Sequence, residues 1–570
     1  MKKTNLSFIK PLAFAIATVG LMAGCGSDDS NSSSSAAIST VVDSEDNQLA
    51  FDATAYTTVN ISLDGVTMAV RQYRIVYVAN PIEMASQSAF GSTMLLDDPY
   101  IYQTMIVSVA EASVSDENTA LYFKVNNAGW FTSAVATDIT EGAEFVSTSD
   151  TDAVGAALKA GYVFIDVGTR SRGARAVDGS WAGKAPAPVV DAKAAIRYLR
   201  LNDALMPGSA ERIVVTGTSG GGGLTAAVSA SGNSADYLPF LAAVGAAGVT
   251  GEDDSLASTI NDDVFAAVAY CPINNLGNAD AGYEWQYNGI RSDDNTGSLN
   301  GVAYSAGVQP AASAAIAALF PDYLNSLNLT LDDSSALTDA TMSSAIVEQL
   351  KEELERQLAA GTDVPDYGED FSVTLRGTTY AIANDWLTLS GSGTSATVAD
   401  IDFEKFLKFV TTPIALKTVV AFDAVGVTGN PNISGETNLF GSDSYEYANF
   451  TQWSWNNNEV LGDGSGTDDT GLAWSDYLAS TSELATQLKL INPIAYLNTD
   501  ADSAPYWYVR HGMIDRDTAY AMQLTLYYAI KNDKSVRDVS FKMPYLTPHS
   551  GNYDVQEAFS WIKTKLDAGI

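Results

Sequence analysis

Cysteine and histidine are both scarce in this sequence of 570 residues, which contains two of each. The cysteines are Cys25 and Cys271. Because Cys25 lies in an N-terminal segment with the features of a secretion signal, the globular part has no pair for an internal disulfide. Metal sites built on several thiolates are excluded for the same reason. The histidines are His511 and His549, so chemistry that needs an imidazole must use one of these two side chains.

Positive charge is scarce as well. The chain has 31 lysines and arginines against 68 aspartates and glutamates, and its formal net charge is −37. A surface of this sign repels nucleic acid and no basic stripe offsets it, so we expect no nucleic-acid partner. General disorder is not expected, because 46% of the residues are hydrophobic and 10% are aromatic, which is enough for a sizeable core.

The N-terminal apolar run at residues 11–23 is too short for an ordinary membrane span, and with the basic residues before it predicts a secretory signal peptide. Residues 21–25 (LMAGC) resemble the lipobox of bacterial lipoproteins, in which the cysteine is lipidated. The resemblance implies a signal peptide over 1–24 and a lipid anchor on Cys25. The position after the cysteine is Gly26 and not the aspartate expected for inner-membrane retention, which favours the outer membrane. The alternative is an ordinary signal peptide with an incidental cysteine and a secreted product.

The rest of the chain divides into segments of different pattern. Residues 25–50 are rich in serine and aspartate, which predicts a flexible tether. Over 51–284 and again over 486–570, apolar runs of strand length alternate with helical periodicity, as expected for two parts of one α/β domain with a doubly wound, mostly parallel sheet. The intervening residues 285–485 break this rhythm, and we expect them to form an inserted lid domain. Strands are expected at 120–125, 161–167, 211–216, 264–270, 506–510 and 536–543, and helices at 190–202, 220–231, 341–359, 517–531 and 553–567.

A candidate nucleophile lies between a predicted strand and a predicted helix. Residues 217–221 read Gly-Thr-Ser-Gly-Gly and match G-x-S-x-G, and the strand–turn–helix setting is the one that a nucleophile elbow requires. We therefore predict Ser219 as nucleophile and the Gly220 amide, at the helix N-terminus, as an oxyanion donor. A glycine-rich turn without catalytic function is the alternative. A phosphate-binding loop is disfavoured because no lysine follows the glycines.

This elbow resembles that of the α/β-hydrolase fold, in which the order along the chain is serine, acid, histidine. Serine becomes a good nucleophile only when a base takes its proton. His549 follows the last predicted strand and precedes the final helix, so we predict it as the base. His511 ends an earlier strand, and we expect a hydrogen-bonded core histidine there.

The acid of the triad should follow the strand that ends near residue 510. Residues 511–515 resemble the His-Gly-x-x-Asp arrangement that is frequent in α/β-hydrolases, which implies Asp515 as the acid, while Asp517 could instead cap the next helix or bind substrate. A second oxyanion donor should come from the loop after an early strand. Gly129, just after the strand at 120–125, is the candidate, and an ordinary turn is the equal alternative.

Longer motifs resemble bacterial tannases of subtype B, within the tannase and feruloyl esterase group. They lie at residues 183–208, 230–237, 262–285, 510–518 and 548–554, and the resemblance is clear over about 120–290 and 490–565. It implies hydrolysis of galloyl or related aromatic esters through an acyl-enzyme, with the triad Ser219, Asp515 and His549. It implies no metal or organic cofactor, and short acidic loops such as 463–469 are expected to be solvated turns.

The resemblance also implies which residues hold the galloyl ring, namely Lys417 and Glu436 from the lid together with Asp517. The chemistry is consistent, because clustered phenolic hydroxyls need convergent acceptors and a cation in a semi-enclosed pocket. The alternative for Lys417 and Glu436 is an ordinary solvated surface pair. Gly220 stands where the family usually has alanine, and we expect this difference to loosen the elbow.

Three other functions fit part of this pattern. A feruloyl or general aromatic carboxylesterase would use the same triad, and a peptidase on this fold would use it too. A non-catalytic envelope lipoprotein that binds polyphenols would have no use for the serine, aspartate and histidine set.

Overall fold

The structure is a computed structural model that describes residues 44–89, 92–95, 97–136, 138–292, 298–299, 302–303, 307–424, 436–444, 446, 448–457, 473–480 and 482–569. All of these belong to one compact unit, Asp43–Ile570. The predicted signal peptide, Cys25, most of the predicted tether and the acidic loop 463–469 lie outside the described residues.

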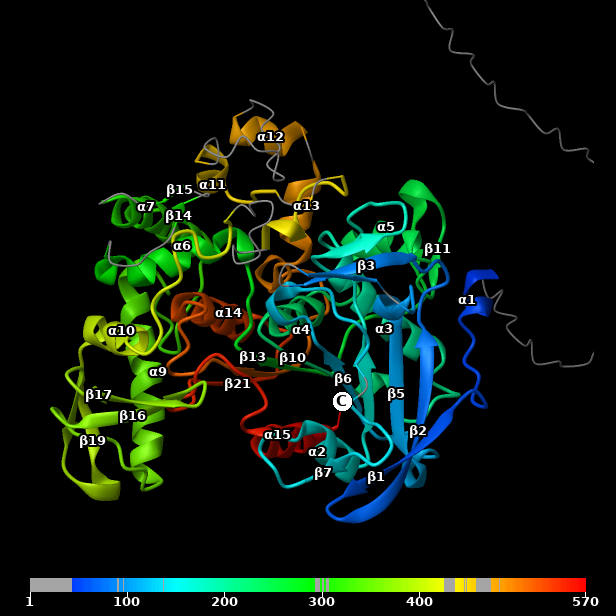
Figure 1. The fold of residues 1–570 in the computed structure, drawn as a ribbon, viewed down its shortest axis with the longest axis horizontal. Helices are drawn as coiled ribbons and strands as arrows, with labels where there is room; N and C mark the ends of the chain where they lie inside the picture. Colours follow the sequence, from blue (N-terminus) through cyan, green and yellow to red (C-terminus); the bar gives the residue numbers. More distant parts are fainter. Residues whose placement is uncertain are drawn as a thin grey trace, which may run out of the picture. The chain divides into compact units, whose positions relative to one another are not determined.

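A central sheet of ten described strands organises the fold, in the order β21-β20-β13-β10-β6-β8-β5-β2-β1-β7 (Figure 1). The strands from β21 to β8 pair in parallel, and β5, β2 and β1 continue the sheet in antiparallel pairs. Short β7 pairs in parallel with β1. The strands are β1 (Thr57–Leu63), β2 (Val66–Val76), β5 (Thr104–Ala110), β6 (Leu121–Val125), β7 (Glu144–Phe145), β8 (Val163–Val167), β10 (Ile213–Thr218), β13 (Ala266–Tyr270), β20 (Tyr506–Arg510) and β21 (Asp538–Lys542).

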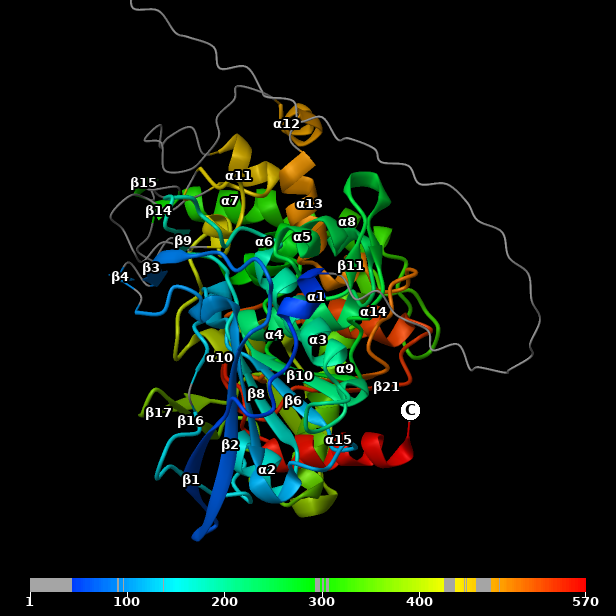
Figure 2. The ribbon, with the colours of Figure 1, turned by 90° about the vertical axis from the view of Figure 1, so that its right-hand side faces the viewer.

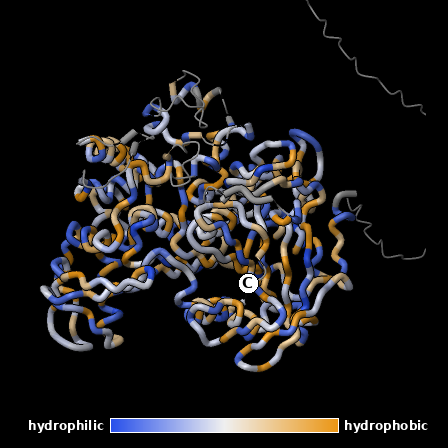
Figure 3. The backbone as a smooth tube through the Cα atoms, viewed as in Figure 1, coloured by the Kyte–Doolittle hydropathy of each residue, from blue (hydrophilic) through white to orange (hydrophobic). Residues whose placement is uncertain are grey.

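The six strands in the middle of the sheet, from β20 to β5, are buried on both faces, which explains why they read as continuous apolar runs. In β10, Ile213 and Val215 belong to one hydrophobic cluster and Val214 to another, because successive side chains point to opposite faces. Apolar stretches recur along these strands in Figure 3. The six strands predicted from the sequence are all present, with ends shifted by at most two residues or so.

Helices cover the sheet on two sides (Figures 1 and 2). Helices α3 (Ala187–Leu201), α4 (Gly220–Ala230) and α14 (Tyr520–Asn532) pack on one face, and α2 (Ala153–Lys159) and α15 (Val555–Ala568) on the other. The predicted doubly wound, mostly parallel α/β-hydrolase fold is therefore confirmed. No described helix is both long enough and apolar enough to span a bilayer.

The predicted tether of residues 25–50 ends too late. Residues 44–48 form the short helix α1 (Ser44–Gln48), and Leu49 is buried in the main core. Asn202 holds this segment from the end of α3: its side chain donates to the Leu49 carbonyl at 3.0 Å and accepts from the Phe51 amide at 2.9 Å. The last residues of the expected tether therefore belong to the folded unit.

The chain between β13 and β20 contains the predicted insertion. Helix α6 (Leu276–Tyr287) crosses the expected boundary at residue 285, so the insertion begins within a helix that packs in the core. The predicted amphipathic helix is α9 (Asp339–Ala359), which buries Ile346, Leu350 and Leu354. The other helices of this region are α7 (Val308–Ala317), α8 (Phe320–Ser326), α10 (Phe403–Thr411), α11 (Gln452–Asn456), α12 (Trp474–Ser480) and α13 (Ser482–Leu490). Its strands are β14 (Ser298–Leu299), β15 (Val302–Ala303), β16 (Asp370–Leu375), β17 (Thr378–Ala383), β18 (Leu387–Ser390) and β19 (Thr397–Ile401).

Smaller elements complete the core. Strands β3 (Met84–Ala89), β4 (Ser92–Leu95) and β9 (Ala174–Ala176) form a three-stranded sheet. Helix α5 (Leu238–Ala243) is followed by the pair β11 (Val249–Thr250) and β12 (Ala257–Ser258).

Candidate active site

Ser219 occupies a strained turn between β10 and α4. Its backbone has φ 63° and ψ −122°, a region that residues with side chains rarely adopt. The turn is held by the Ser219 amide, which donates to the Tyr270 carbonyl at 2.9 Å. A Cβ on Gly217 would lie 2.3 Å from the Gly221 carbonyl oxygen, so the turn needs glycine there. This geometry presents the serine side chain at the end of the sheet where the parallel strands terminate.

His549 lies in the loop between β21 and α15 and touches two predicted partners. Its Nε2 is 2.8 Å from Ser219 Oγ, and its Nδ1 is 2.8 Å from Asp515 Oδ2. The loop packs tightly on the elbow, because a Cβ on Gly551 would come within 2.0 Å of the Thr218 hydroxyl. The structure thus brings the predicted nucleophile, base and acid into one hydrogen-bonded chain.

Asp515 follows β20 and its side chain is fully buried. Burial by itself raises the pKa of this carboxyl, but the neighbouring imidazoles of His549 and His511 outweigh it and hold the pKa at about 2. Burial likewise acts to lower the pKa of His549, and the Asp515 carboxylate outweighs it, so this pKa lies above its usual value. An ionised carboxylate therefore orients the imidazole and stabilises its protonated form.

His511 ends β20 as a buried histidine, as expected from the sequence, but it also contacts the acid. Its Nδ1 lies 3.3 Å from Asp515 Oδ2, and its ring packs edge-on against Tyr520. Burial lowers the pKa of His511 to about 4, so the ring is neutral at pH 7. Sequence reasoning placed it in the core and missed this contact.

Cys271 is a neighbour of the base that sequence reasoning missed. Its thiol donates to the Ser550 carbonyl at 3.3 Å, and its Sγ lies 3.9 Å from His549 Nε2. Burial raises the pKa of this thiol, which keeps it protonated. Ligand atoms of Cys271, Asp515 and His549 lie within 4.8 Å of one another, a spacing that a metal ion could use. The available signal was position, because Cys271 directly follows β13 at the same sheet edge as Ser219.

The predicted oxyanion donors are adjacent in space. Gly220 is the first residue of α4, so its N–H has no intrahelical acceptor. Gly129 lies in the 3₁₀ turn η3 (Ala128–Trp130) after β6, with φ 57°. A Cβ on Gly220 would lie 2.1 Å from the Trp130 amide nitrogen and 2.3 Å from the Asn127 oxygen. Rather than loosening the elbow, the absence of a side chain at Gly220 makes room for the Gly129 loop.

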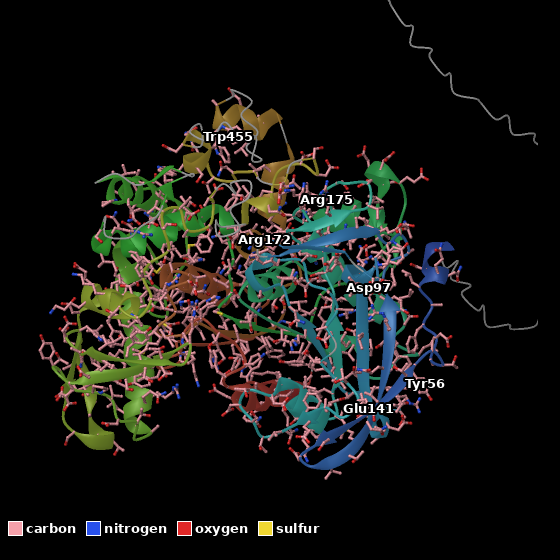
Figure 4. All side chains as sticks on the ribbon, viewed as in Figure 1. Tyr56, Asp97, Glu141, Arg172, Arg175 and Trp455 are labelled. Atoms are coloured by element: carbon pink, nitrogen blue, oxygen red, sulfur yellow. The ribbon has the colours of Figure 1, made fainter. Side chains whose placement is uncertain are left out.

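Glu436 is not a solvated surface residue. It begins the 3₁₀ turn η9 (Glu436–Leu439), and its side chain is only 10% exposed. One carboxylate oxygen lies 3.2 Å from Nη1 of Arg172, whose guanidinium carbon is 3.7 Å from the Phe131 ring centre. Figure 4 shows Arg172 near the centre of the molecule. Phe131 directly follows η3, so Arg172 connects Glu436 to the loop that contains Gly129. Sequence reasoning missed this arginine.

The chain segments that carry Lys417 and Asp517 are linked by the Tyr283 hydroxyl. The Lys417 amide donates to the Tyr283 hydroxyl at 3.2 Å, and that hydroxyl donates to the Arg516 carbonyl at 2.9 Å. The Lys417 ammonium lies 4.2 Å from the Phe422 ring centre. Asp517, the next residue after Arg516, donates its amide to Asp515 Oδ1 at 2.8 Å.

Comparisons with known proteins agree on one group of enzymes. The family model described as BD-FAE matches residues 138–243. A crystal structure of tannase from Lactobacillus plantarum is 30% identical, covers 91% of this chain and 100% of its own, and has a TM-score of 0.66. The tannase of Fusobacterium nucleatum is 29% identical, with coverages of 91% and 99% and a TM-score of 0.67. A tannin acyl hydrolase in complex with ethyl gallate is 30% identical, with coverages of 91% and 99% and a TM-score of 0.65. No curated protein matches the chain.

Proposed function

The chain belongs to the tannase family, and we propose that it is a serine carboxylesterase that hydrolyses galloyl or related phenolic esters. The observation that carries this proposal is the position of His549, within 2.8 Å of both the Ser219 hydroxyl and the Asp515 carboxylate. A nucleophile, a base and a buried acid in hydrogen-bond contact are what acyl transfer to serine requires.

The proposed reaction has two halves. His549 Nε2 takes the proton of Ser219 as its Oγ bonds to the ester carbonyl carbon, and the carbonyl electrons move to the oxygen. The Gly220 and Gly129 amides hold this oxyanion. When the tetrahedral intermediate collapses, the bond to the alcohol breaks and His549 gives the alcohol its proton. Water then attacks the acyl-enzyme with the same base and releases the acid.

Recognition of the acyl group is assigned to Lys417, Glu436 and Asp517. One cation and two carboxylates around a ring can pair with phenolic hydroxyls, which lose their water on binding and need new partners. Similar proteins have been crystallised with ethyl gallate and with 3,4-dihydroxybenzoate. Both ligands have adjacent ring hydroxyls, which these three side chains would be suited to bind.

Attachment to the cell envelope through a lipid on Cys25 is a second part of the proposal and rests on the lipobox-like sequence of residues 21–25. The full-length protein should partition into detergent and into the outer-membrane fraction. A Cys25→Ser variant should be released as soluble protein. Equal partitioning of the two proteins would contradict the anchor.

The catalytic proposal is tested by hydrolysis of methyl gallate, methyl ferulate and 4-nitrophenyl acetate, with Ser219→Ala as the control. The proposal is supported if the wild type hydrolyses methyl gallate and Ser219→Ala lowers that rate by at least about a thousandfold. Turnover of only the other two esters would replace the gallate assignment by a feruloyl or general aromatic carboxylesterase. Binding of gallate without turnover of any ester would leave a polyphenol-binding protein.

A further inference from the structure

One buried hydroxyl group lies between the two chain segments that carry Lys417 and Asp517. Tyr283, in α6, has no exposed surface. Its hydroxyl accepts from the Lys417 amide and donates to the Arg516 carbonyl. A phenol can do both only while it is neutral, and burial raises the pKa of Tyr283, which keeps it so.

The Lys417 backbone is held on its other side as well. Arg291 donates from Nη1 to the Lys417 carbonyl at 2.5 Å. The Arg291 guanidinium is paired with Glu284, and neither side chain is exposed. Both contacts on Lys417 thus start from α6 or from residues just after it, which leaves the Lys417 backbone little freedom to shift relative to the core.

The Asp517 segment is also held at both ends of one peptide unit. The Arg516 carbonyl accepts from Tyr283, and the Asp517 amide donates to the Asp515 carboxylate. Any shift of this peptide would therefore also displace the carboxylate of Asp515, which orients His549. Tyr283 therefore contacts the backbone of the two segments that carry Lys417 and Asp517. It is not one of the residues that exchange a proton with Ser219 or bond to the ester.

We propose that Tyr283 is a positioning residue that sets the distance between Lys417 and Asp517, and thereby the preference of this site for esters of hydroxylated aromatic acids. The inference rests on the proposed function, because it assigns Tyr283 a part in binding the galloyl ring. Its hydroxyl bridges the Lys417 amide and the Arg516 carbonyl, and so links the two segments directly. Substrates without ring hydroxyls make no use of that spacing.

The test compares Tyr283→Phe with Tyr287→Phe on methyl gallate and 4-nitrophenyl acetate. Tyr287 provides a matched control, since it lies one turn further along α6 and its buried hydroxyl makes no hydrogen bond to the Lys417 or Arg516 backbone. Tyr283→Phe removes both hydrogen bonds of this hydroxyl, and we expect it to raise KM for methyl gallate about 3- to 10-fold. The change in kcat, and the effect on 4-nitrophenyl acetate, should be at least threefold smaller. Tyr287→Phe should match the wild type on both esters.

A double variant checks that the effect passes through the ring-binding residues. In an Asp517→Asn background, Tyr283→Phe should add less than a twofold further loss on methyl gallate, because coupled residues are not additive. If Tyr283→Phe does not fold, 3-fluorotyrosine at position 283 keeps the ring and weakens the hydroxyl as an acceptor, and a smaller rise in the same KM is expected.

Three results would overturn the inference. Equal losses on both esters would make Tyr283 a general structural residue, and an unchanged KM for gallate would remove its role altogether. If the wild type cleaves 4-nitrophenyl acetate but not methyl gallate, the proposed function itself fails and the inference falls with it. The wild-type measurement separates this last case from the other two.

Discussion

His549 and Asp515 form a 2.8 Å hydrogen bond in which the carboxylate is wholly buried and the imidazole partly exposed. The buried carboxylate raises the pKa of His549 above its usual value. Because only the neutral imidazole can take the serine proton, activity should rise as pH increases through this pKa.

Replacing Asp515 by asparagine should change both the rate and the pH profile. Asp515→Asn removes the charge that raises the pKa of His549, so the rising limb of kcat/KM should move to lower pH. The maximal rate should fall by about 10³- to 10⁴-fold, because the imidazole loses its orienting partner. A pH profile of 4-nitrophenyl acetate hydrolysis measures both effects. A limb that stays in place or moves to higher pH would contradict the assignment of the acid.

The two histidines should respond very differently to substitution. His549→Ala should lower kcat by at least about a thousandfold, since it removes the base. His511→Asn should lower kcat roughly tenfold or less, because His511 is neutral and, of the three predicted triad residues, contacts only the acid. Steady-state kinetics of both variants, with thermal unfolding to confirm folding, settle the comparison. A larger loss for His511→Asn would reverse the two roles.

Gly220→Ala should disturb the Gly129 loop. The new Cβ would meet the Trp130 amide nitrogen at 2.1 Å, and backbone atoms must move to accept it. We expect a loss of about 1–3 kcal/mol in the free energy of unfolding and a lower kcat. Gly289→Ala is the control, since nothing lies within 4 Å of its added Cβ. Wild-type kinetics and stability in Gly220→Ala would show that the loop does not press on the elbow in solution.

Arg172 and Glu436 should contribute to the free energy of unfolding as a coupled pair, so the effects of replacing them should not be additive. Arg172→Met leaves the Glu436 carboxylate, only 10% exposed, without this partner and should destabilise the fold by about 3–5 kcal/mol. The double variant Arg172→Met with Glu436→Gln should recover part of that loss. Denaturant unfolding of the single and double variants measures the difference. Additive losses would mean that the two side chains do not interact energetically.

Zinc ions should inhibit the enzyme through Cys271. The thiol lies 3.9 Å from His549 Nε2, and Zn²⁺ favours a pair of cysteine sulfur and imidazole, with release of the thiol proton on binding. A bound ion would occupy the lone pair with which His549 acts as base. Cys271→Ala should weaken this inhibition about tenfold relative to wild type. Chelation by EDTA should restore the wild-type rate, and equal inhibition of both proteins would place the ion elsewhere.

Local patterns made the elbow and the order of the site residues predictable. The glycines around Ser219 and the apolar strand before it lie within a dozen residues, and His549 followed from chain order in a chain with two histidines. The end of the tether was misplaced because Leu49 is held by Asn202, which lies 153 residues away. The contacts of Arg172 with Glu436 and of Tyr283 with Lys417 likewise join segments that are distant in the sequence, which no local periodicity encodes.

The elbow and the base are separated by 330 residues, with the whole insertion between β13 and β20 interposed. During synthesis, Ser219 leaves the ribosome long before His549 is made, and β13 has no strand on its β20 side until residues 506–510 follow. A nascent chain, or one that a protease has cut before residue 549, contains Ser219 but lacks His549. Ester hydrolysis would therefore report that the chain has been made past His549 and that the loop carrying this histidine has packed on the elbow.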